Sequence, residues 1–398
     1  MRRIAIVSQR YGNEVNGGAE TYTKEVAQKL SGLYEVEVLT TCALDYLSWK
    51  NYYRPGIHNV DGILVRRFPV KRKRNTAQFN KLYQDLIYEG NSDNNEKERA
   101  WVRAQGPLCD ACIEYMEMHT NEYDAFIFIT YLYYLTAMGI EKVREKALLV
   151  PTAHDEPPIH FPFYQSVFHA PQAIAFLTEE ERYFVHGLFH NEKIPYEIVG
   201  MGMEMPKWPV SPRRFTEKHG DTPYILYAGR IDASKGCEEL FSFFLRYKQE
   251  RPSPLRLLLM GKAHMDISTH PDIQYLGFVD EQEKYDGIAG AKYLMLPSQF
   301  ESLSISVLEG MMLGIPCIVN GRCAVLKGHC IRSNGGLYYD RYDEFSGILD
   351  YMERHEDIYS TMQKNAADYI RQNYVWDVVL RKYNELLTRI FDGDTEVQ

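Results

Sequence analysis

The sequence lacks the features that mark several large classes of protein. Its most apolar stretch, Ala125 to Leu135, is about half as long as a membrane-spanning helix needs to be. The N-terminus, MRRIAIVSQRYG, leads into a short apolar segment without a signal-peptide core of adequate length. Basic residues are outnumbered, at 45 Lys and Arg against 54 Asp and Glu, and the net charge is −9. We therefore expect a cytoplasmic protein that does not bind nucleic acid.

Cysteine is scarce and its spacing is irregular. The seven cysteines include one C-x-x-C pair, Cys109 and Cys112, which no second pair and no His-x-x-x-His segment accompanies. A structural zinc ion takes four ligands, so we expect ordinary thiols on a helix in a reducing compartment. The segment Asp392-Gly393-Asp394 has the D-x-D spacing of some metal sites, but no strand precedes it. The sequence therefore predicts no metal site.

Length and patterning predict two α/β domains. The 398 residues exceed a typical single domain, and 45% hydrophobic with 25% charged residues is ordinary for globular proteins. Short apolar runs alternate with longer amphipathic segments. The predicted strands are Ile4–Ser8, Val36–Thr40, Ile63–Arg67, Ala125–Ile129, Leu148–Thr152, Ile174–Leu177, Tyr224–Ala228, Leu255–Met260, Ile273–Leu276, Tyr293–Leu296 and Pro316–Val319. Strands that are apolar on both faces and separated by helices indicate parallel sheets.

The predicted domain boundary lies in a segment rich in proline. Four prolines and a charge cluster interrupt the periodicity between residues 203 and 223. We therefore predict an N-terminal domain over residues 1–205 and a second domain over residues 206–375. Residues 376–398 are predicted to form a helix and tail that pack back on the first domain.

Loops of the first domain carry candidate ligand-binding residues, because doubly wound sheets bind ligands at the carboxyl ends of their strands. Gly17 and Gly18 open a helix after the first strand, where backbone N–H groups can approach an anion. A plain turn explains these glycines equally well. His154 follows a strand on a loop that two prolines make rigid, which favours a functional role over a place in the core.

Loops of the second domain carry two cations. Arg230 and Lys235 follow the strand Tyr224–Ala228. An arginine fork and a lysine charge at a strand exit suit phosphate oxygens. Met260 with Gly261, and Val279 after the next strand, fit loops that contact a flat aromatic ligand.

Two glutamates follow the strand Tyr293–Leu296 in the segment QFESLSISVLEG. Glu301 lies in the exit loop, and Glu309 lies about two turns into a helix predicted over residues 303–313. A carboxylate that accepts two hydroxyl hydrogen bonds recognises a sugar or a ribose diol well. A second explanation stays open, because Ser306 and Glu309 match an S-x-x-E capping box.

Together these motifs resemble the retaining nucleotide-sugar glycosyltransferases of family 4. The resemblance rests on Arg230-x4-Lys235, Glu301-x7-Glu309, Gly17-Gly18, His154-Asp155 and residues 199–204. It implies the GT-B fold, an α/β fold of two facing Rossmann-like domains with parallel sheets and an interdomain cleft. The chain departs from the family pattern at residues 302–304 and at Gly200, which we expect to affect donor preference rather than class.

The resemblance assigns a role to each matched residue. The catalytic residues would be His154, Arg230, Lys235 and Glu301. Arg230 and Lys235 would hold the donor diphosphate, Glu301 the hydroxyls of the transferred sugar, and Glu309 the ribose. Met260, Gly261 and Val279 would line the base, the N–H groups of Leu303, Ser304 and Ile305 would face a phosphate, Gly17 and Gly18 would approach the phosphates, and His154 would contact the sugar on the acceptor side.

The activity that the resemblance implies is hexosyl transfer without a metal or other cofactor. The donor would be a UDP-, GDP- or ADP-sugar, and the acceptor a glycan or lipid-linked molecule of bacterial surface polysaccharide or glycolipid synthesis. Two alternatives stay open. One is another GT-B-type sugar-nucleotide enzyme, such as an epimerase, and the other is a non-catalytic nucleotide-sugar-binding subunit.

A run of four basic residues lies in the predicted acceptor-side domain. It consists of Lys71, Arg72, Lys73 and Arg74. A solvated loop is the plainer interpretation of such a run. The second interpretation is peripheral contact with an anionic membrane, at its inner face, or with a lipid-linked acceptor.

Overall fold

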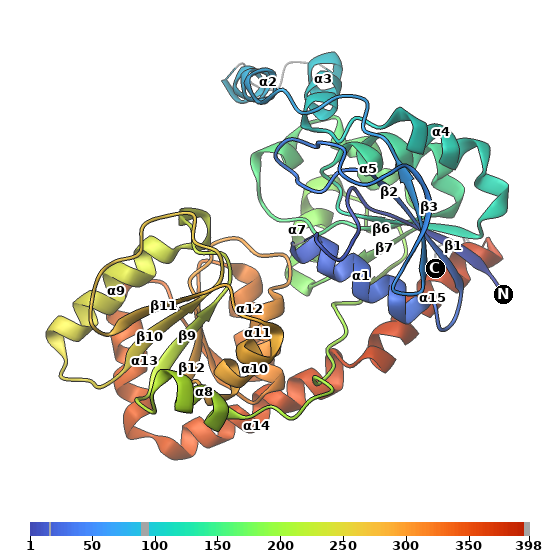
Figure 1. Cartoon of the computed structure of the whole chain (residues 1–398). Coiled ribbons are helices and arrows are strands. Elements are labelled where there is room, and N and C mark those ends of the chain that lie inside the picture. Colours follow the sequence, from blue (N-terminus) through green and yellow to red (C-terminus); the bar gives the residue numbers. More distant parts are fainter. Residues whose placement is uncertain (16, 89–94, 394–398) are drawn as a thin grey trace. The chain divides into compact units, whose positions relative to one another are not determined.

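A computed structural model describes residues 1–15, 17–88 and 95–393, which form two compact units (Figure 1). Unit 1 comprises residues 1–201 and 379–398, and unit 2 comprises residues 202–378. Each unit is built around one sheet with helices packed on it. Within the described ranges, no helix is both long enough and apolar enough to cross a membrane.

Unit 1 contains an eight-stranded sheet in the order β3-β4-β2-β1-β5-β6-β7-β8. Neighbouring strands pair in parallel, except that β3 and β4 form an antiparallel hairpin at one edge. The strands are β1 (Arg3–Val7), β2 (Glu35–Thr41), β3 (Gly56–Val60), β4 (Ile63–Phe68), β5 (Ala125–Ile129), β6 (Ala147–Val150), β7 (Ala173–Phe176) and β8 (Tyr196–Ile198). Every residue of β5, β6 and β7 is buried, as expected for parallel strands covered on both faces.

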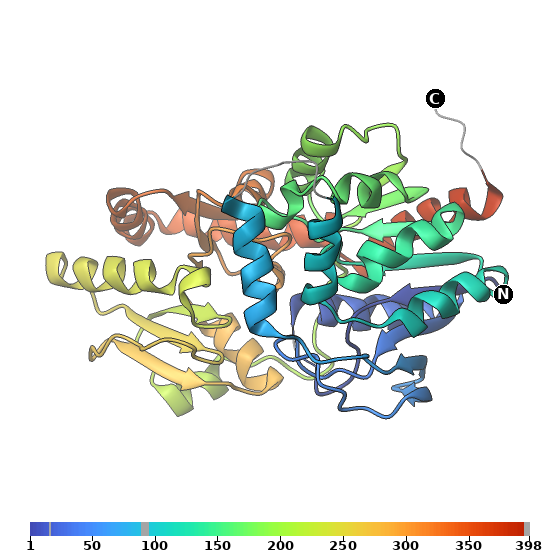
Figure 2. The ribbon, with the colours of Figure 1, turned by 90° about the horizontal axis from the view of Figure 1, so that it is seen from above.

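The helices of unit 1 come from both ends of the chain. They are α1 (Gly18–Leu30), α2 (Thr76–Tyr88), α3 (Asn95–Gln105), α4 (Asp110–Met118), α5 (Tyr134–Gly139), α6 (Tyr164–His169), α7 (Glu179–Phe189) and most of α15 (Trp376–Asp392), with 3-10 turns η1 (Thr120–Glu122), η2 (Ile140–Lys146) and η3 (Pro157–His160). The helix α15 is fixed to α1 by a buried hydrogen bond of 2.5 Å between the hydroxyls of Tyr22 and Tyr383. Helices α2 and α3 pack side by side (Figure 2).

Unit 2 contains a six-stranded parallel sheet in the order β11-β10-β9-β12-β13-β14. The strands are β9 (Tyr224–Ala228), β10 (Arg256–Met260), β11 (Ile273–Gly277), β12 (Tyr293–Leu296), β13 (Cys317–Asn320) and β14 (Gly336–Tyr339). The chain builds the sheet outward from β9 in one direction and then from β12 in the other. This is the Rossmann order, and ligands bind beyond the carboxyl ends of the two strands where the direction reverses.

Two helices of unit 2 have side-chain caps at their N-termini. The helices of this unit are α8 (Pro212–His219), α9 (Cys237–Glu250), α10 (Glu281–Gly290), α11 (Ile305–Met312), α12 (Ala324–Ser333), α13 (Tyr342–Arg354) and α14 (Glu356–Asn373), with the 3-10 turn η4 (Ala233–Lys235). Ser211 and Asp280 cap α8 and α10, because their side-chain oxygens accept hydrogen bonds from backbone N–H groups of the first turn.

The two segments that join the units run beside each other. The backbone N–H of Met203 donates to the carbonyl oxygen of Tyr374 over 2.5 Å, and Met203 forms a parallel bridge with Val375. The chain therefore leaves and re-enters unit 1 through neighbouring segments.

The sequence predicted the buried strands well and the edge strands poorly. Every predicted strand is present to within two residues at either end, and the expected α/β fold with parallel sheets is confirmed. The strands β3, β8 and β14 were not predicted. The helix predicted over residues 303–313 begins at Ile305 and ends at Met312.

Candidate functional site

Two loops meet where the chain direction reverses in the sheet of unit 2. Because β9 and β12 are neighbours, the loop that follows β9 lies against the loop that follows β12. The ammonium nitrogen of Lys235, in η4, lies 2.6 Å from Glu301 Oε1, in the loop after β12. The structure thus brings together a cation and a carboxylate that are 66 positions apart.

The close approach of these loops depends on Gly236. This residue has φ 73°, and a Cβ atom there would lie 2.4 Å from the carbonyl oxygen of Pro297. Only glycine adopts this conformation at low cost and leaves room for the neighbouring backbone. The glycine that follows Lys235 therefore allows the lysine to reach Glu301.

Arg230 is held beside an acid of its own loop. Its guanidinium forms an ion pair with Asp232 and lies 3.4 Å from Ser234 Oγ. Although burial raises the pKa of the Asp232 carboxyl, the Ser234 hydroxyl and the Arg230 guanidinium bring this pKa below its ordinary value. The side chain of Arg230 is 45% exposed, so a ligand can reach it without unfolding the loop.

Glu309 lies on α11 and makes its contacts with α10. Lys284 Nζ is 2.7 Å from Glu309 Oε1, and the hydroxyl of Tyr285 is 3.3 Å from the same oxygen. The side chain of Glu309 is 9% exposed. Because α11 begins at Ile305 and Ser304 is its N-cap, Ser306 is the second helical residue and is too late to be the cap of an S-x-x-E box. The capping-box explanation of Glu309 is therefore wrong.

The N-terminus of α11 lies next to these side chains. Its first intrahelical hydrogen bond runs from Leu308 N to Ser304 O over 3.3 Å, so the N–H groups of residues 305–307 precede the helical pattern. Ser304 has φ 69°, and its buried hydroxyl has no hydrogen-bond partner among the described residues. Backbone donors at a helix N-terminus favour an anion such as phosphate.

The loop before α11 forms a hydrogen bond with a buried histidine, His329. His329 Nε2 lies 2.8 Å from the carbonyl oxygen of Leu303, and His329 Nδ1 lies 3.1 Å from the Tyr369 hydroxyl. Burial lowers the pKa of His329 to about 4, so the ring is neutral at physiological pH and Nε2–H donates to Leu303. No sequence motif predicts this contact between His329 and Leu303.

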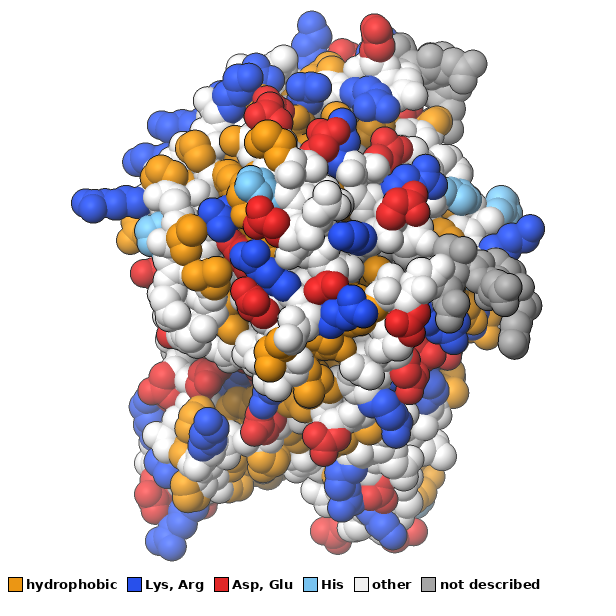
Figure 3. Space-filling model, turned by 90° about the vertical axis from the view of Figure 1, so that its right-hand side faces the viewer, with side chains coloured by type: hydrophobic (Ala, Val, Ile, Leu, Met, Phe, Trp, Pro, Cys, Tyr) orange, Lys and Arg blue, Asp and Glu red, His pale blue; other side chains and the backbone are white. Residues whose placement is uncertain are grey.

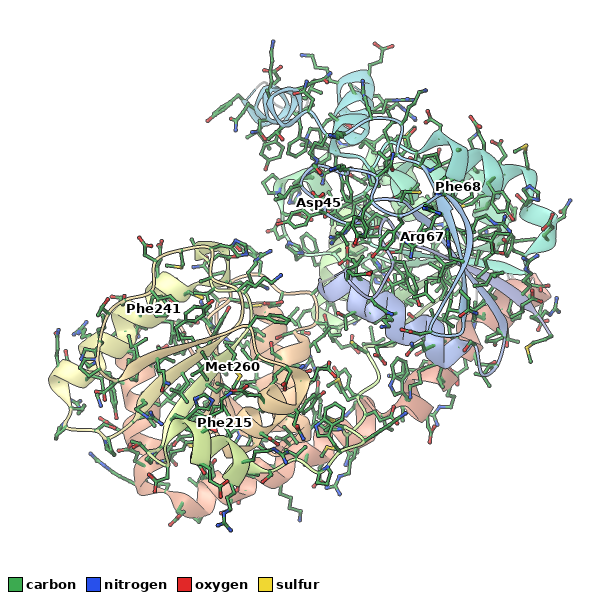
Figure 4. All side chains as sticks on the ribbon, in the orientation of Figure 1. Asp45, Arg67, Phe68, Phe215, Phe241 and Met260 are labelled. Carbon is green, nitrogen blue, oxygen red and sulfur yellow. The ribbon has the colours of Figure 1, made fainter. Side chains whose placement is uncertain are left out.

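The residues predicted to line a base lie after β10 and β11. The side chain of Met260 is 2% exposed and packs with Phe215 around Gly287 in the interior of unit 2 (Figure 4). Gly261 has φ 135°, and a Cβ atom there would lie 1.9 Å from a backbone oxygen of the Arg230 loop. Val279 is half-buried beside Phe278, an aromatic residue that is 70% exposed. At this edge of the sheet, a ligand can therefore contact the backbone of residues 260–261 and the side chains of residues 278–279.

The candidate residues of unit 1 lie after β1 and β6. Gly17 is the N-cap of α1 and Gly18 is its first residue. The first turn of α1 carries Glu20, which forms a buried ion pair of 2.5 Å with Arg10. His154 is partly exposed, and its Nε2 lies 3.9 Å from Glu156 Oε2.

In the basic run of unit 1, Arg74 is partly buried, and Lys71, Arg72 and Lys73 are exposed. Arg74 Nη2 donates to the carbonyl oxygen of Gln105 over 2.6 Å, and its guanidinium stacks on Trp49, 5.2 Å from the ring centroid. Lys71 Nζ lies 3.4 Å from Asp110 Oδ2. The interpretation of all four residues as a solvated loop is therefore wrong for Arg74.

The other polar motifs form no metal site within residues 1–15, 17–88 and 95–393. Cys109 and Cys112 are buried, and burial raises the pKa of the Cys109 thiol to about 12. Across the described part of the chain, no group of three or more His, Cys, Asp or Glu side chains could hold a metal ion. Asp394 of the D-x-D segment lies outside the described residues.

The sequence did not reveal the partners of the predicted residues. Lys284 and Tyr285 are separated from Glu309 by about two dozen positions and belong to no motif. Asp232 stands two positions from Arg230, and its opposite charge was the one available sign of a local ion pair.

Comparison with solved structures decides the fold. Sucrose-phosphate synthase from Thermosynechococcus elongatus is 14% identical, with a TM-score of 0.70 over 99% of this chain and 100% of that one. HepE from Anabaena, solved in complex with UDP and glucose, is 14% identical, with a TM-score of 0.68 over 98% of this chain and 100% of that one. The chain has the GT-B fold.

The family-model match of this GT-B protein lies in its second unit. Residues 222–344, which include Arg230, Lys235, Glu301 and Glu309, match the family "Glycosyl transferases group 1". The Bacillus subtilis (strain 168) protein described as "Putative glycosyltransferase YtcC" is 23% identical over 217 residues, or 48% of this chain. That match spans about half, 53%, of the relative's length. Within unit 2, residues 222–344 are therefore similar to group 1 glycosyltransferases.

Proposed function

We propose that this protein is a retaining, metal-independent glycosyltransferase that moves a hexose-type sugar from a nucleotide-sugar donor to a glycan or lipid-linked acceptor. The observation that carries the proposal is the contact between Lys235 and Glu301 beyond the adjacent carboxyl ends of β9 and β12. The complexes of HepE with UDP and with UDP-glucose make a UDP-sugar the first donor to test.

The diphosphate of the donor would be held by Arg230, Lys235 and the N–H groups at the start of α11. Without donor, the two cations pair with Asp232 and Glu301, which keeps their charges compensated. When the bond between the sugar C1 and the diphosphate oxygen breaks, that oxygen keeps the electron pair. Fixed cations and backbone dipoles stabilise the negative charge that develops there, so these residues supply the stabilisation for which other enzymes use a metal ion.

The two glutamates would distinguish the two ends of the donor. Once Lys235 binds phosphate, Glu301 is available to accept hydrogen bonds from hydroxyls of the transferred sugar. Glu309, oriented by Lys284 and Tyr285, would accept hydrogen bonds from both hydroxyls of the ribose. The backbone at Met260 and Gly261 and the side chain of Val279 would line the base.

Unit 1 would supply the acceptor side. His154 would contact the sugar, and Gly17 and Gly18 would approach the phosphates with backbone N–H groups. An acceptor of surface polysaccharide or glycolipid synthesis would be met at the inner membrane face through the basic run, of which Lys71, Arg72 and Lys73 are exposed.

The test begins with calorimetric titration of UDP-, GDP- and ADP-sugars to identify the donor. A glycan acceptor is then added, and the anomeric configuration of the product is assigned by NMR. We expect retention, with the same rate in the presence of EDTA. An inverted product, or activity abolished by EDTA, would contradict the proposal. Release of free nucleotide that requires the acceptor would separate a transferase from an epimerase and from a non-catalytic binding subunit.

A further inference from the structure

A pocket of about 260 Å³ in unit 1 is lined by four cations. Arg72, Lys73 and Arg74 come from the segment before α2, and Arg103 comes from α3. No Asp or Glu is found among the described residues that line it. The face of the molecule in Figure 3, by contrast, carries basic and acidic side chains interspersed.

Arg74 provides a charge in a fixed position on the wall of this pocket. Its guanidinium donates two hydrogen bonds to the carbonyl oxygen of Gln105, of 2.6 and 3.1 Å. It also lies over the rings of Trp49 and Phe79, at 5.2 and 4.9 Å from their centroids. None of these contacts is to a carboxylate, so they orient the guanidinium without neutralising it.

The two nearby acids, Asp45 and Asp110, do not line the pocket, and their hydrogen bonds go to residues outside it. Asp45 accepts hydrogen bonds from the backbone N–H and the hydroxyl of Ser48, at 2.6 and 2.7 Å. Asp110 pairs with Lys71 and accepts from the Tyr134 hydroxyl. Like charges that share a small space repel one another, so the cluster favours binding of a multiply charged anion.

The start of α2 adds a further positive potential to the same pocket. Asn75 and Gln78 both line it, and Asn75 Oδ1 accepts a hydrogen bond of 3.0 Å from Gln78 N at the helix N-terminus. The helix continues for 13 residues, so its dipole places partial positive charge here.

We propose that this pocket binds the phosphate of a phosphate monoester or diphosphate. A dianion suits several cations better than a single carboxylate does, and arginine forks match the geometry of phosphate oxygens. The inference deepens the proposed function and rests on it, because the phosphate would then belong to the acceptor. A soluble phosphate ester and a lipid headgroup present the same chemistry, and the experiment below separates them.

The experiment titrates pyrophosphate into the full chain by calorimetry at low ionic strength. All proteins carry Arg230→Ala and Lys235→Ala, which weakens binding at the proposed donor site. The pocket variant adds Arg72→Gln and Lys73→Gln. The matched control adds Lys142→Gln and Arg144→Gln, which remove the same charges from η2, away from the pocket.

The pocket variant should bind pyrophosphate at least about 10-fold more weakly, because it loses charge-assisted hydrogen bonds that contribute to the binding free energy. The affinity of the control should be unchanged. Equal affinity in the two variants would overturn the proposal. Arg103→Gln gives an independent check, because it removes a pocket cation from a different element and should weaken binding in the same way.

Vesicle binding separates the two sources of phosphate. Vesicles of phosphatidic acid, whose headgroup is a phosphate monoester, with phosphatidylcholine are compared with vesicles of phosphatidylcholine alone. Loss of both pyrophosphate and anionic-vesicle binding in the pocket variant supports a lipid headgroup, and loss of pyrophosphate binding alone supports a soluble ester. Nucleotide-sugar binding to the chain with intact Arg230 and Lys235 is measured separately. Its absence would refute the proposed function while pyrophosphate binding still supported the pocket.

Discussion

Replacing Glu309 with Gln tests the donor site most directly, because the structure removes the competing explanation for this residue. If Glu309 binds the ribose diol, the neutral amide accepts more weakly and presents a donor where the diol needs an acceptor. We expect nucleotide binding to weaken by about 1.5–3 kcal/mol, the range for hydrogen bonds to charged groups. This corresponds to a rise in Kd of about 10- to 150-fold.

The same substitution also breaks the ion pair with Lys284, which needs its own control. Lys284→Gln breaks that ion pair and leaves the carboxylate in place. The side chains are 26% and 9% exposed, so we expect each variant to lose about 1 kcal/mol of unfolding free energy. Denaturant titration should therefore show similar losses of stability in the two variants.

The two variants should differ in calorimetric titrations with free nucleotide. Glu309→Gln should bind several-fold more weakly than Lys284→Gln at matched stability, because only Glu309→Gln removes the acceptor. Equal Kd values for the two variants would mean that the ion pair matters and the carboxylate does not touch the ribose. A wild-type Kd for Glu309→Gln would refute the donor assignment outright.

The remaining predictions concern the neighbouring residues. Lys235→Ala should lower kcat/KM by an amount that corresponds to a loss of about 2–4 kcal/mol of transition-state stabilisation. Near-normal turnover would contradict the phosphate role. Glu301→Gln should bind free nucleotide normally but lose affinity for the nucleotide sugar; equal losses for both ligands would argue against a sugar contact. Gly236→Ala should cost about 1–3 kcal/mol of unfolding free energy, whereas Gly347→Ala, where no atom lies within 4 Å of the added Cβ, should be neutral or slightly stabilising. The pKa of His329 is about 4 in the folded protein, below its pKa in the unfolded chain, so the unfolded state binds more protons at pH values between the two. The free energy of unfolding should therefore fall by about 2 kcal/mol from pH 7 to pH 5. In His329→Gln this part of the pH dependence, followed by denaturant titration, should disappear.

The sequence predicted the strands that are apolar on both faces, because burial dictates their composition. The strand β5 is buried at every position and was predicted with correct ends. The edge strand β3 has no buried residue and contains glycine, histidine and asparagine, which are poor indicators of a strand. Local composition therefore finds the central strands, whereas of the four edge strands it finds β11 and misses β3, β8 and β14.

The start of α11 shows what local sequence reasoning left open. The segment Ser304-Ile305-Ser306 offers two possible caps, and the capping-box pattern favours Ser306. The structure uses Ser304 in a left-handed conformation instead, with the preceding carbonyl held by His329. Contacts between distant segments decided between the two, as they also decided that Lys284 faces Glu309.

Unit 1 is assembled from two pieces of chain separated by the whole of unit 2, and this affects how the protein is made. A ribosome releases the first 201 residues long before it reaches Tyr383 and the rest of α15. Until then the Tyr22 hydroxyl on α1 lacks its hydrogen-bond partner, Tyr383. Unit 2 is contiguous and can fold during synthesis, whereas unit 1 can be completed only after α15 emerges. A nonsense mutation that removes α15 would therefore damage the unit that is made first.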